Sequence, residues 1–276
     1  MDHADEKVTL DSLRAMKASG RKILGVVAWD YQMARIADRV GVEIVSVGDS
    51  VGVNLWGHAN PLEVTLDEML VVCRAVRRGV GRALLSCDFP FGPLQEGTAA
   101  AVSTAVRLVK EAGADMVKLD GAADFPEAVE ALTRAGIPVF AQFGITPQTA
   151  LRHGVDYASA SKPGAEAPPA MVDELVRQAK VLEEAGAALL DFTNSGPAVG
   201  PRVVEAVSVP VLGGFGGGPW LDGRVRMASA AIGYSAAAVD SPPDTYANVG
   251  RIAFEALSAL ADDVRSGRHI RGQAPR

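Results

Sequence analysis

Polar side chains follow the carboxyl ends of several short apolar runs. Asp49 and Ser50 follow one run, Asp88 ends a second, and Lys118 with Asp120 ends a third. Three carboxylates and one ammonium in a small space are typical of a site for a hard divalent cation, which takes oxygen ligands and leaves positions for water and substrate. A single aspartate at a strand end is more often a helix cap, but its repetition over several strands favours one shared site.

A further carboxylate lies inside an apolar run at residues 187–193. Burying Asp191 there is costly unless another group pairs with it. Thr193 ends the same run, and the spacing of two places both side chains on one face of a strand. Lys118 and Asp120 have the same spacing, and Gln142 stands near the end of another run. The sequence therefore predicts a polar cluster at the ends of several strands.

The elements that must hold these residues alternate between strands and helices. The apolar runs predict strands at 23–29, 42–48, 83–88, 115–121, 137–143, 187–193 and 209–214. Helical spacing predicts helices at 65–79, 98–114, 125–136, 170–186 and 202–208. Thr65 with Glu68 forms a capping-box pattern, and Gly113 ends the second of these helices.

This alternation predicts an α/β fold with a parallel sheet, because both faces of most strands are apolar. A closed (β/α)8 barrel and an open doubly wound sheet both fit the pattern, and the length of 276 residues favours the barrel. An eighth unit is expected within 225–260, although its strand is weak. The glycine-rich run 213–219 is not a dinucleotide-binding motif; it predicts a flexible loop or a backbone cradle after the seventh strand.

Composition excludes several classes of protein. The net charge of −6 argues against nucleic acid as a partner, and no apolar run is long enough to cross a membrane. The polar first residues do not resemble a signal peptide. Cys73 and Cys87 lack metal-type spacing and predict reduced thiols in a cytoplasmic protein. We expect one barrel domain over 1–276, with flexible ends at about 1–8 and 266–276.

A set of short motifs in the order of the predicted strands carries a family resemblance. They are VGDS (47–50), GHANPLEVT (57–65), CDFPFG (87–92), ADMVKLDG (114–121), GITPQ (144–148) and the glycine run before LDG (221–223). Together they resemble the ketopantoate (3-methyl-2-oxobutanoate) hydroxymethyltransferase family, which is related to the phosphoenolpyruvate mutase and isocitrate lyase barrels. The resemblance runs from about residue 11 to residue 233.

The resemblance implies a (β/α)8 barrel that binds Mg²⁺ and an α-keto acid. It also implies 5,10-methylenetetrahydrofolate as carbon donor and a homo-oligomer, often a decamer. By position, Asp49 and Asp88 match the metal ligands, Ser50 the residue that meets the substrate carboxylate, and Lys118 another substrate contact. The chemistry agrees, since a metal that chelates the keto acid stabilises its enolate, and Lys118 adds positive charge nearby.

Three site positions depart from the family pattern. The family's glutamate base at the end of strand six falls on Thr193, its strand-five histidine falls on Gln142, and a metal-supporting glutamate is the shorter Asp120. Thr and Gln cannot act as general bases at neutral pH. The loop at 153–169 is longer than its counterpart and rich in Ala and Pro.

Asp191 is therefore the candidate for a relocated base, and the alternative is an ion pair with Lys118. Without a base, the polar end at 193–195 would hydrogen-bond a different group of the substrate. A structural and a catalytic role both remain open for His58. His153 in the divergent loop is expected to be exposed to solvent, with substrate contact as the alternative, and Trp29 is expected to pack beside the site.

Three functions remain open at this point. The first is a hydroxymethyltransferase of the ketopantoate type with an altered substrate. The second is a lyase or aldolase that acts on a keto acid without folate, and the third is a non-catalytic paralogue. The retained Asp49, Asp88 and Lys118 argue against the third. The related lyases carry a cysteine in a mobile loop, where neither Cys73 nor Cys87 is expected, so the first function is preferred.

Overall fold

The computed structural model describes residues 6–154, 166–241 and 244–272. The outermost parts of the predicted flexible ends and most of the divergent loop at 153–169 lie outside these residues. The chain divides into two compact units, Met1–Arg226 and Met227–Arg276, and each is described by itself.

The first unit is built on a closed barrel of eight parallel strands in sequence order. The strands are β1 (Ile23–Val27), β2 (Ile44–Val47), β3 (Leu84–Asp88), β4 (Met116–Leu119), β5 (Val139–Gly144), β6 (Leu189–Thr193), β7 (Val211–Gly213) and β8 (Gly223–Met227). The closed barrel confirms the predicted (β/α)8 fold and excludes the open doubly wound sheet. The eighth strand begins at Gly223, two residues before the segment in which it was expected.

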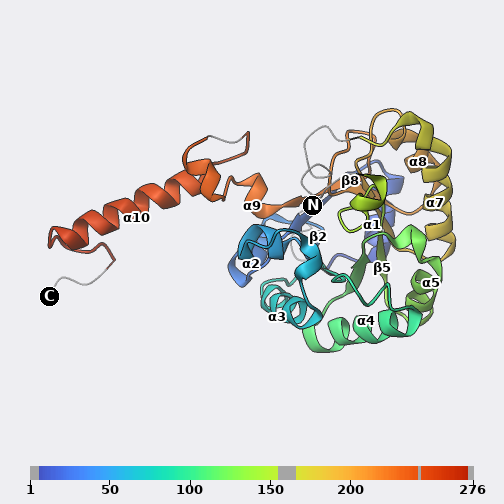
Figure 1. The fold of residues 1–276 in the computed structure, drawn as a ribbon, viewed down its shortest axis with the longest axis horizontal. Helices are drawn as coiled ribbons and strands as arrows, with labels where there is room; N and C mark the ends of the chain where they lie inside the picture. Colours follow the sequence, from blue (N-terminus) through green and yellow to red (C-terminus); the bar gives the residue numbers. More distant parts are fainter. Residues whose placement is uncertain (1–5, 155–165, 242–243, 273–276) are drawn as a thin grey trace. The chain divides into compact units, whose positions relative to one another are not determined.

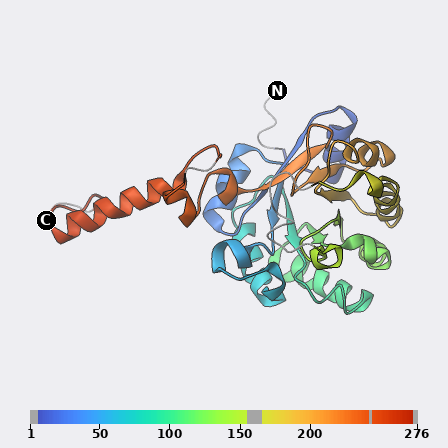
Figure 2. The ribbon, with the colours of Figure 1, turned by 45° about the horizontal axis from the view of Figure 1, so that its top comes forward.

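Helices surround the strands in both views of the ribbon (Figures 1 and 2). They are α1 (Leu10–Ala18), α2 (Tyr31–Val40), α3 (Leu66–Arg77), α4 (Thr98–Ala112), α5 (Pro126–Arg134), α7 (Val172–Glu184) and α8 (Gly200–Ala206). The Thr65–Glu68 capping box is present at the start of α3, and Gly113 adopts a left-handed conformation at the end of α4, as predicted.

Large apolar side chains fill the barrel near the amino ends of its strands. One cluster joins residues from most of the strands with Leu13 and Met16 of α1. Ile23, Ile44 and Leu189 in this cluster are almost completely buried. The apolar character of the strands thus has a direct cause, because the inner face packs in the barrel and the outer face is covered by helices.

Gly223 allows the backbones of β8 and β1 to approach each other closely. A Cβ atom at Gly223 would lie 2.1 Å from the backbone oxygen of Ile23, so no larger residue fits without moving the backbone. This close approach accounts for the weak strand pattern at 223–227, where Arg224 and Arg226 alternate with smaller or apolar residues.

The second unit contains α9 (Ala228–Ala231) and α10 (Val249–Arg265). Asn248 caps α10, since its side chain accepts a hydrogen bond from the backbone N–H of Arg251. Among the described residues of the whole chain, no helix is long and apolar enough to cross a membrane.

Candidate active site

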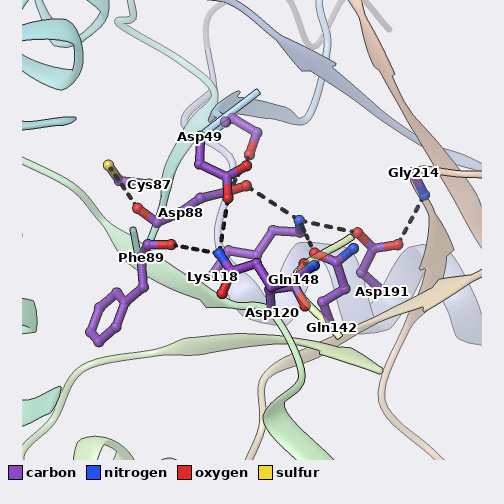
Figure 3. A network of polar contacts seen from close by, with 12 residues as sticks. Asp49, Cys87, Asp88, Phe89, Lys118, Asp120, Gln142, Gln148, Asp191 and Gly214 are labelled. Atoms are coloured by element: carbon purple, nitrogen blue, oxygen red, sulfur yellow. Dashed lines mark hydrogen bonds and ion pairs between the residues drawn. The ribbon is translucent and has the colours of Figure 1, made fainter. Parts of the chain in front are cut away.

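Side chains alternate between the two faces of each strand, and this places the predicted polar residues inside the barrel near the carboxyl ends of its strands. Met116, Phe140 and Leu189 belong to the interior cluster, so the residues two positions later face the interior as well. Those residues are Lys118 on β4, Gln142 on β5 and Asp191 on β6. Asp88 ends β3, Asp49 follows β2 and Asp120 follows β4. Figure 3 shows these side chains converging from different strands, as the sequence predicts.

Lys118 lies at the centre of the cluster. Its ammonium is 3.4 Å from Asp88 Oδ2 and 3.3 Å from Asp191 Oδ2, and it donates a 2.5 Å hydrogen bond to Gln142 Oε1. The residue is only 8% exposed. Burial alone would lower the pKa of Lys118, but the attraction of four nearby carboxylates outweighs burial and raises it. Lys118 is therefore a permanent positive charge inside the barrel.

Three carboxyl groups near Lys118, those of Asp49, Asp88 and Asp120, have raised pKa values. Burial, with repulsion from Asp120, raises the pKa of Asp49 to about 6. Burial is the largest cause that raises the pKa of Asp88 to about 7; attraction by Lys118 opposes this rise, and repulsion from Asp49 and Asp191 adds to it. The pKa of Asp120 is raised to about 6, mainly by burial. The site thus holds more acidic groups than its single cation balances.

A divalent cation would relieve this excess of negative charge, and the residues fit such an ion. Asp120 has one buried oxygen, Oδ1, without a hydrogen-bond partner among the described residues. In the same part of the chain, no three Asp, Glu, His or Cys side chains form a complete ligand group. Mg²⁺ commonly takes only one or two carboxylates and keeps water or substrate oxygens. The assignment of Asp49 and Asp88 as such a pair stays a prediction.

Gln148 orients the carboxylates that line this part of the site. Its side-chain amide donates a 2.9 Å hydrogen bond to Asp49 Oδ2, and its backbone N–H donates to Asp120 Oδ2 at 3.2 Å. Sequence reasoning missed this role, although Gln148 lies in the GITPQ motif. Ser50 follows Asp49 directly, is half-buried, and has its Oγ close to Gly48.

The end of β6 is connected to Lys118 through two separate contacts. Asp191 pairs with Lys118, and its other oxygen, Oδ1, accepts a 2.9 Å hydrogen bond from the backbone N–H of Gly214. Gln142 donates from Nε2 to Thr193 Oγ1 at 3.0 Å. The ion pair foreseen for Asp191 as an alternative to a base is thus present, and the catalytic role of Asp191 stays a prediction.

The glycine-rich loop after β7 is tied to β8. Arg224 donates hydrogen bonds to the backbone oxygens of Gly213 and Gly217, at 3.1 and 3.0 Å. The loop supplies the Gly214 N–H that binds Asp191, which agrees with the backbone-cradle interpretation more than with a flexible loop. Arg224 was not predicted, because nothing in the sequence distinguishes it from a solvated arginine.

The remaining predicted residues lie outside the cluster of contacts. Trp29 is buried and donates a 3.2 Å hydrogen bond to the backbone oxygen of Gly48, next to Asp49. His58 lies near Trp56, with ring centroids 5.8 Å apart, and its Nδ1 has no partner among the described residues. The side chain of His153 lies outside what the structure describes.

The raised pKa values predict an unusual pH dependence of stability in the metal-free protein. A carboxyl with a raised folded-state pKa keeps a proton that the unfolded chain releases, so its contribution to stability falls as pH rises from about 4 through its folded pKa. Asp88→Asn removes one such group. Between about pH 4 and pH 8, the free energy of unfolding should fall about 2–4 kcal/mol further in wild type than in the variant. Urea unfolding with a chelator present measures this, and parallel pH curves would contradict it.

Comparison with known proteins identifies relatives over almost the whole chain. The family model of ketopantoate hydroxymethyltransferase matches residues 7–269. A 3-methyl-2-oxobutanoate hydroxymethyltransferase of Cyanothece sp. is 38% identical over 264 residues, which cover 94% of this chain and 97% of that protein. The enzyme of the same name from Pyrococcus furiosus is 38% identical over 260 residues, covering 92% of this chain and 87% of that protein.

Solved structures share the fold at low sequence identity. Phosphonopyruvate hydrolase has a TM-score of 0.60 at 17% identity, covering 98% of this chain and 92% of that one. A 2,3-dimethylmalate lyase of the PEP mutase/isocitrate lyase superfamily has a TM-score of 0.59 at 15% identity, covering 97% and 90%. The family match and the sequence relatives agree with the motifs noted in the sequence. The chain therefore belongs to the ketopantoate hydroxymethyltransferase family of enzymes.

Proposed function

We propose that this chain transfers a hydroxymethyl group from 5,10-methylenetetrahydrofolate to an α-keto acid such as 3-methyl-2-oxobutanoate. Family membership supports the reaction class. The observation that carries the proposal is the buried Lys118 surrounded by carboxylates at the carboxyl ends of the barrel strands, where catalytic groups of such barrels lie. A role in pantothenate synthesis and a homo-oligomeric state belong to the same proposal.

Each residue of the cluster has a role in binding the keto acid. Asp49 and Asp88 would hold Mg²⁺, and Asp120 beside them would support the metal site. When bound, the metal polarises the keto acid and acidifies the proton on the carbon next to the ketone. Ser50 would meet the substrate carboxylate. Lys118 stabilises negative charge that develops on the substrate, since its ammonium stays protonated.

The residues at the ends of β5 and β6 are poorly suited to remove a proton from the substrate. Thr193 and Gln142, which stand where the family pattern has titrating residues, do not ionise near neutral pH. Asp191 is the nearest carboxylate on the same face of β6, but both of its oxygens already accept from donors, Lys118 and the Gly214 N–H. These contacts favour a counter-ion role, in which Asp191 holds Lys118 in place. The expected consequence is an enzyme that forms the enolate slowly.

The arrangement of the cysteines favours transfer over the lyase alternative. The lyases related to this family use a cysteine in a mobile loop, whereas Cys73 lies on α3 and Cys87 on β3, and both are buried. A hydrogen bond with Cys73, together with burial, raises the pKa of the Cys87 thiol, so it is protonated at neutral pH. Neither thiol is suited to act as a catalytic acid or nucleophile.

Turnover of a keto-acid panel tests the function directly. With Mg²⁺ and methylenetetrahydrofolate, wild type should form a hydroxymethylated product that does not form when either is omitted. Asp49→Asn should lower this activity more than about 100-fold, a larger loss than follows from changing a residue that only supports a metal ligand. Asp67→Asn, at an exposed aspartate on α3, is the matched control and should leave the rate unchanged. Cleavage of a keto acid without folate would instead establish the lyase.

Exchange of the α-proton of 3-methyl-2-oxobutanoate in D₂O isolates proton removal from carbon transfer. General-base catalysis typically contributes about 10²–10⁴-fold, so a site without a base exchanges slowly. We expect slow exchange in wild type, little change in Asp191→Asn, and faster exchange in Thr193→Glu, which places a carboxylate at the end of β6. Loss of exchange in Asp191→Asn would identify Asp191 as the base. Fast wild-type exchange that survives this change would contradict both roles.

A further inference from the structure

Gln148 contacts the neighbourhoods of all three carboxylates that line the proposed metal site. Its side-chain amide donates a 2.9 Å hydrogen bond to Asp49 Oδ2 and a 3.4 Å hydrogen bond to the backbone oxygen of Phe89, the residue after Asp88. Its backbone N–H donates to Asp120 Oδ2 at 3.2 Å. Figure 3 shows Gln148 among these residues. One residue from the loop after β5 therefore joins the carboxyl ends of β2, β3 and β4.

A turn that contains proline presents the Gln148 backbone to Asp120. The Thr149 N–H donates to the backbone oxygen of Thr146 at 3.2 Å, which closes a β-turn with Pro147 at its second position. The two threonine hydroxyls lie 2.7 Å apart and hold the same turn. Proline is favoured there because its φ angle is fixed, and the N–H of the third residue can then bond outside the turn. The contact with Asp120 therefore does not depend on the Gln148 side chain.

The partners of the Gln148 amide fix its orientation. An ionised carboxylate and a backbone carbonyl only accept hydrogen bonds, so the NH₂ group must face Asp49 and Phe89. The amide carries no charge, so it holds Asp49 in place without neutralising it. An ammonium or guanidinium at this position would also orient the carboxylate, but it would repel a bound cation. Gln148 therefore fixes the acid and leaves its charge for a metal.

Gln148 holds one oxygen, Oδ2, of both Asp49 and Asp120 and leaves Oδ1 of each carboxylate for a metal. Asp120 Oδ1 is buried and has no hydrogen-bond partner among the described residues, and Asp49 as a whole is as buried as Asp120. A carboxylate held in this way favours coordination through one oxygen. Mg²⁺ requires near-ideal octahedral geometry, whereas Ca²⁺ takes more oxygens in a flexible arrangement and accepts two from one carboxylate. The hydrogen bonds of Gln148 therefore suit the smaller ion.

We propose that Gln148 is a positioning residue that favours Mg²⁺ relative to Ca²⁺ by holding Asp49 to one free oxygen. It acts through Asp49 and does not itself bind the ion. This inference rests on the metal site of the proposed function and deepens it. Loss of the amide frees Asp49 Oδ2, so the carboxylate can turn and coordinate through both oxygens. Such a change weakens binding of the small, geometrically strict ion more than binding of the large one.

Calorimetric titration of the metal-free protein with Mg²⁺ alone and with Ca²⁺ alone tests the proposal without a measurement of activity. Gln148→Met keeps the length of the side chain and removes its donors, while the backbone N–H that binds Asp120 stays. The variant should bind Mg²⁺ about 10–100-fold more weakly than wild type and bind Ca²⁺ nearly as well. The ratio of the two affinities should therefore fall by about the same factor.

A second variant and a matched control separate this role from a structural one. Gln148→Glu keeps the size of the side chain but replaces the donor with a carboxylate that repels Asp49. It should also lower the preference for Mg²⁺, with stronger Ca²⁺ binding, because it adds an oxygen ligand. Gln178→Met removes another amide that donates to a carboxylate, Glu174 Oε1 at 2.9 Å on α7, and should leave both affinities unchanged.

The outcomes separate this proposal from the proposed function. Equal weakening of both ions in Gln148→Met would show that Gln148 has only a structural role, and this overturns the proposal. Unchanged binding of both ions in that variant overturns it as well, and either result leaves the proposed function intact. If wild type binds neither ion, the metal site of the proposed function is wrong, and this inference fails with it.

Discussion

The buried charge of Lys118 is the constraint on which the site depends. An ammonium inside a barrel is stable only if nearby carboxylates and hydrogen-bond acceptors replace the water that it has lost. Asp88 and Asp191 supply the charge, and Gln142 supplies the acceptor. Four strands are thereby tied to one atom, β3, β4, β5 and β6. Polar side chains in the cluster use part of their hydrogen-bonding capacity on Lys118, and only their remaining donors and acceptors can contact a substrate.

This constraint explains how Gln142 and Thr193 act without titrating. Gln142 accepts from Lys118 through its carbonyl oxygen and so turns its amide toward Thr193 Oγ1, to which it donates. At the ends of β2, β3 and β4, Asp49, Asp88 and Asp120 carry pKa values raised by burial and mutual repulsion, which a divalent cation would lower. The site is thus acidic at the ends of β2 to β4, where we propose that the metal binds.

Much of the fold was predictable, because apolar strands and helical spacing follow directly from burial on two faces. The capping box at Thr65 and the glycine that ends α4 also followed from local chemistry. The strand at 223–227 was less clear, since close approach to β1 requires Gly223 where a strand pattern expects a larger residue. Gln148 was missed because its carboxylate partners, Asp49 and Asp120, are distant in the sequence. Arg224 was missed because its partners are backbone oxygens, which no side-chain motif marks.

The charge balance around Lys118 can be measured with a double-mutant cycle of Lys118→Met and Asp191→Leu in urea unfolding. If the ion pair holds the site together, Lys118→Met alone should cost about 3–5 kcal/mol, because it leaves a buried carboxylate without its partner. Adding Asp191→Leu should then recover a large part of that loss, since the double variant buries neither charge. Additive costs, within about 0.5 kcal/mol, would contradict the account and show that Lys118 and Asp191 are energetically independent.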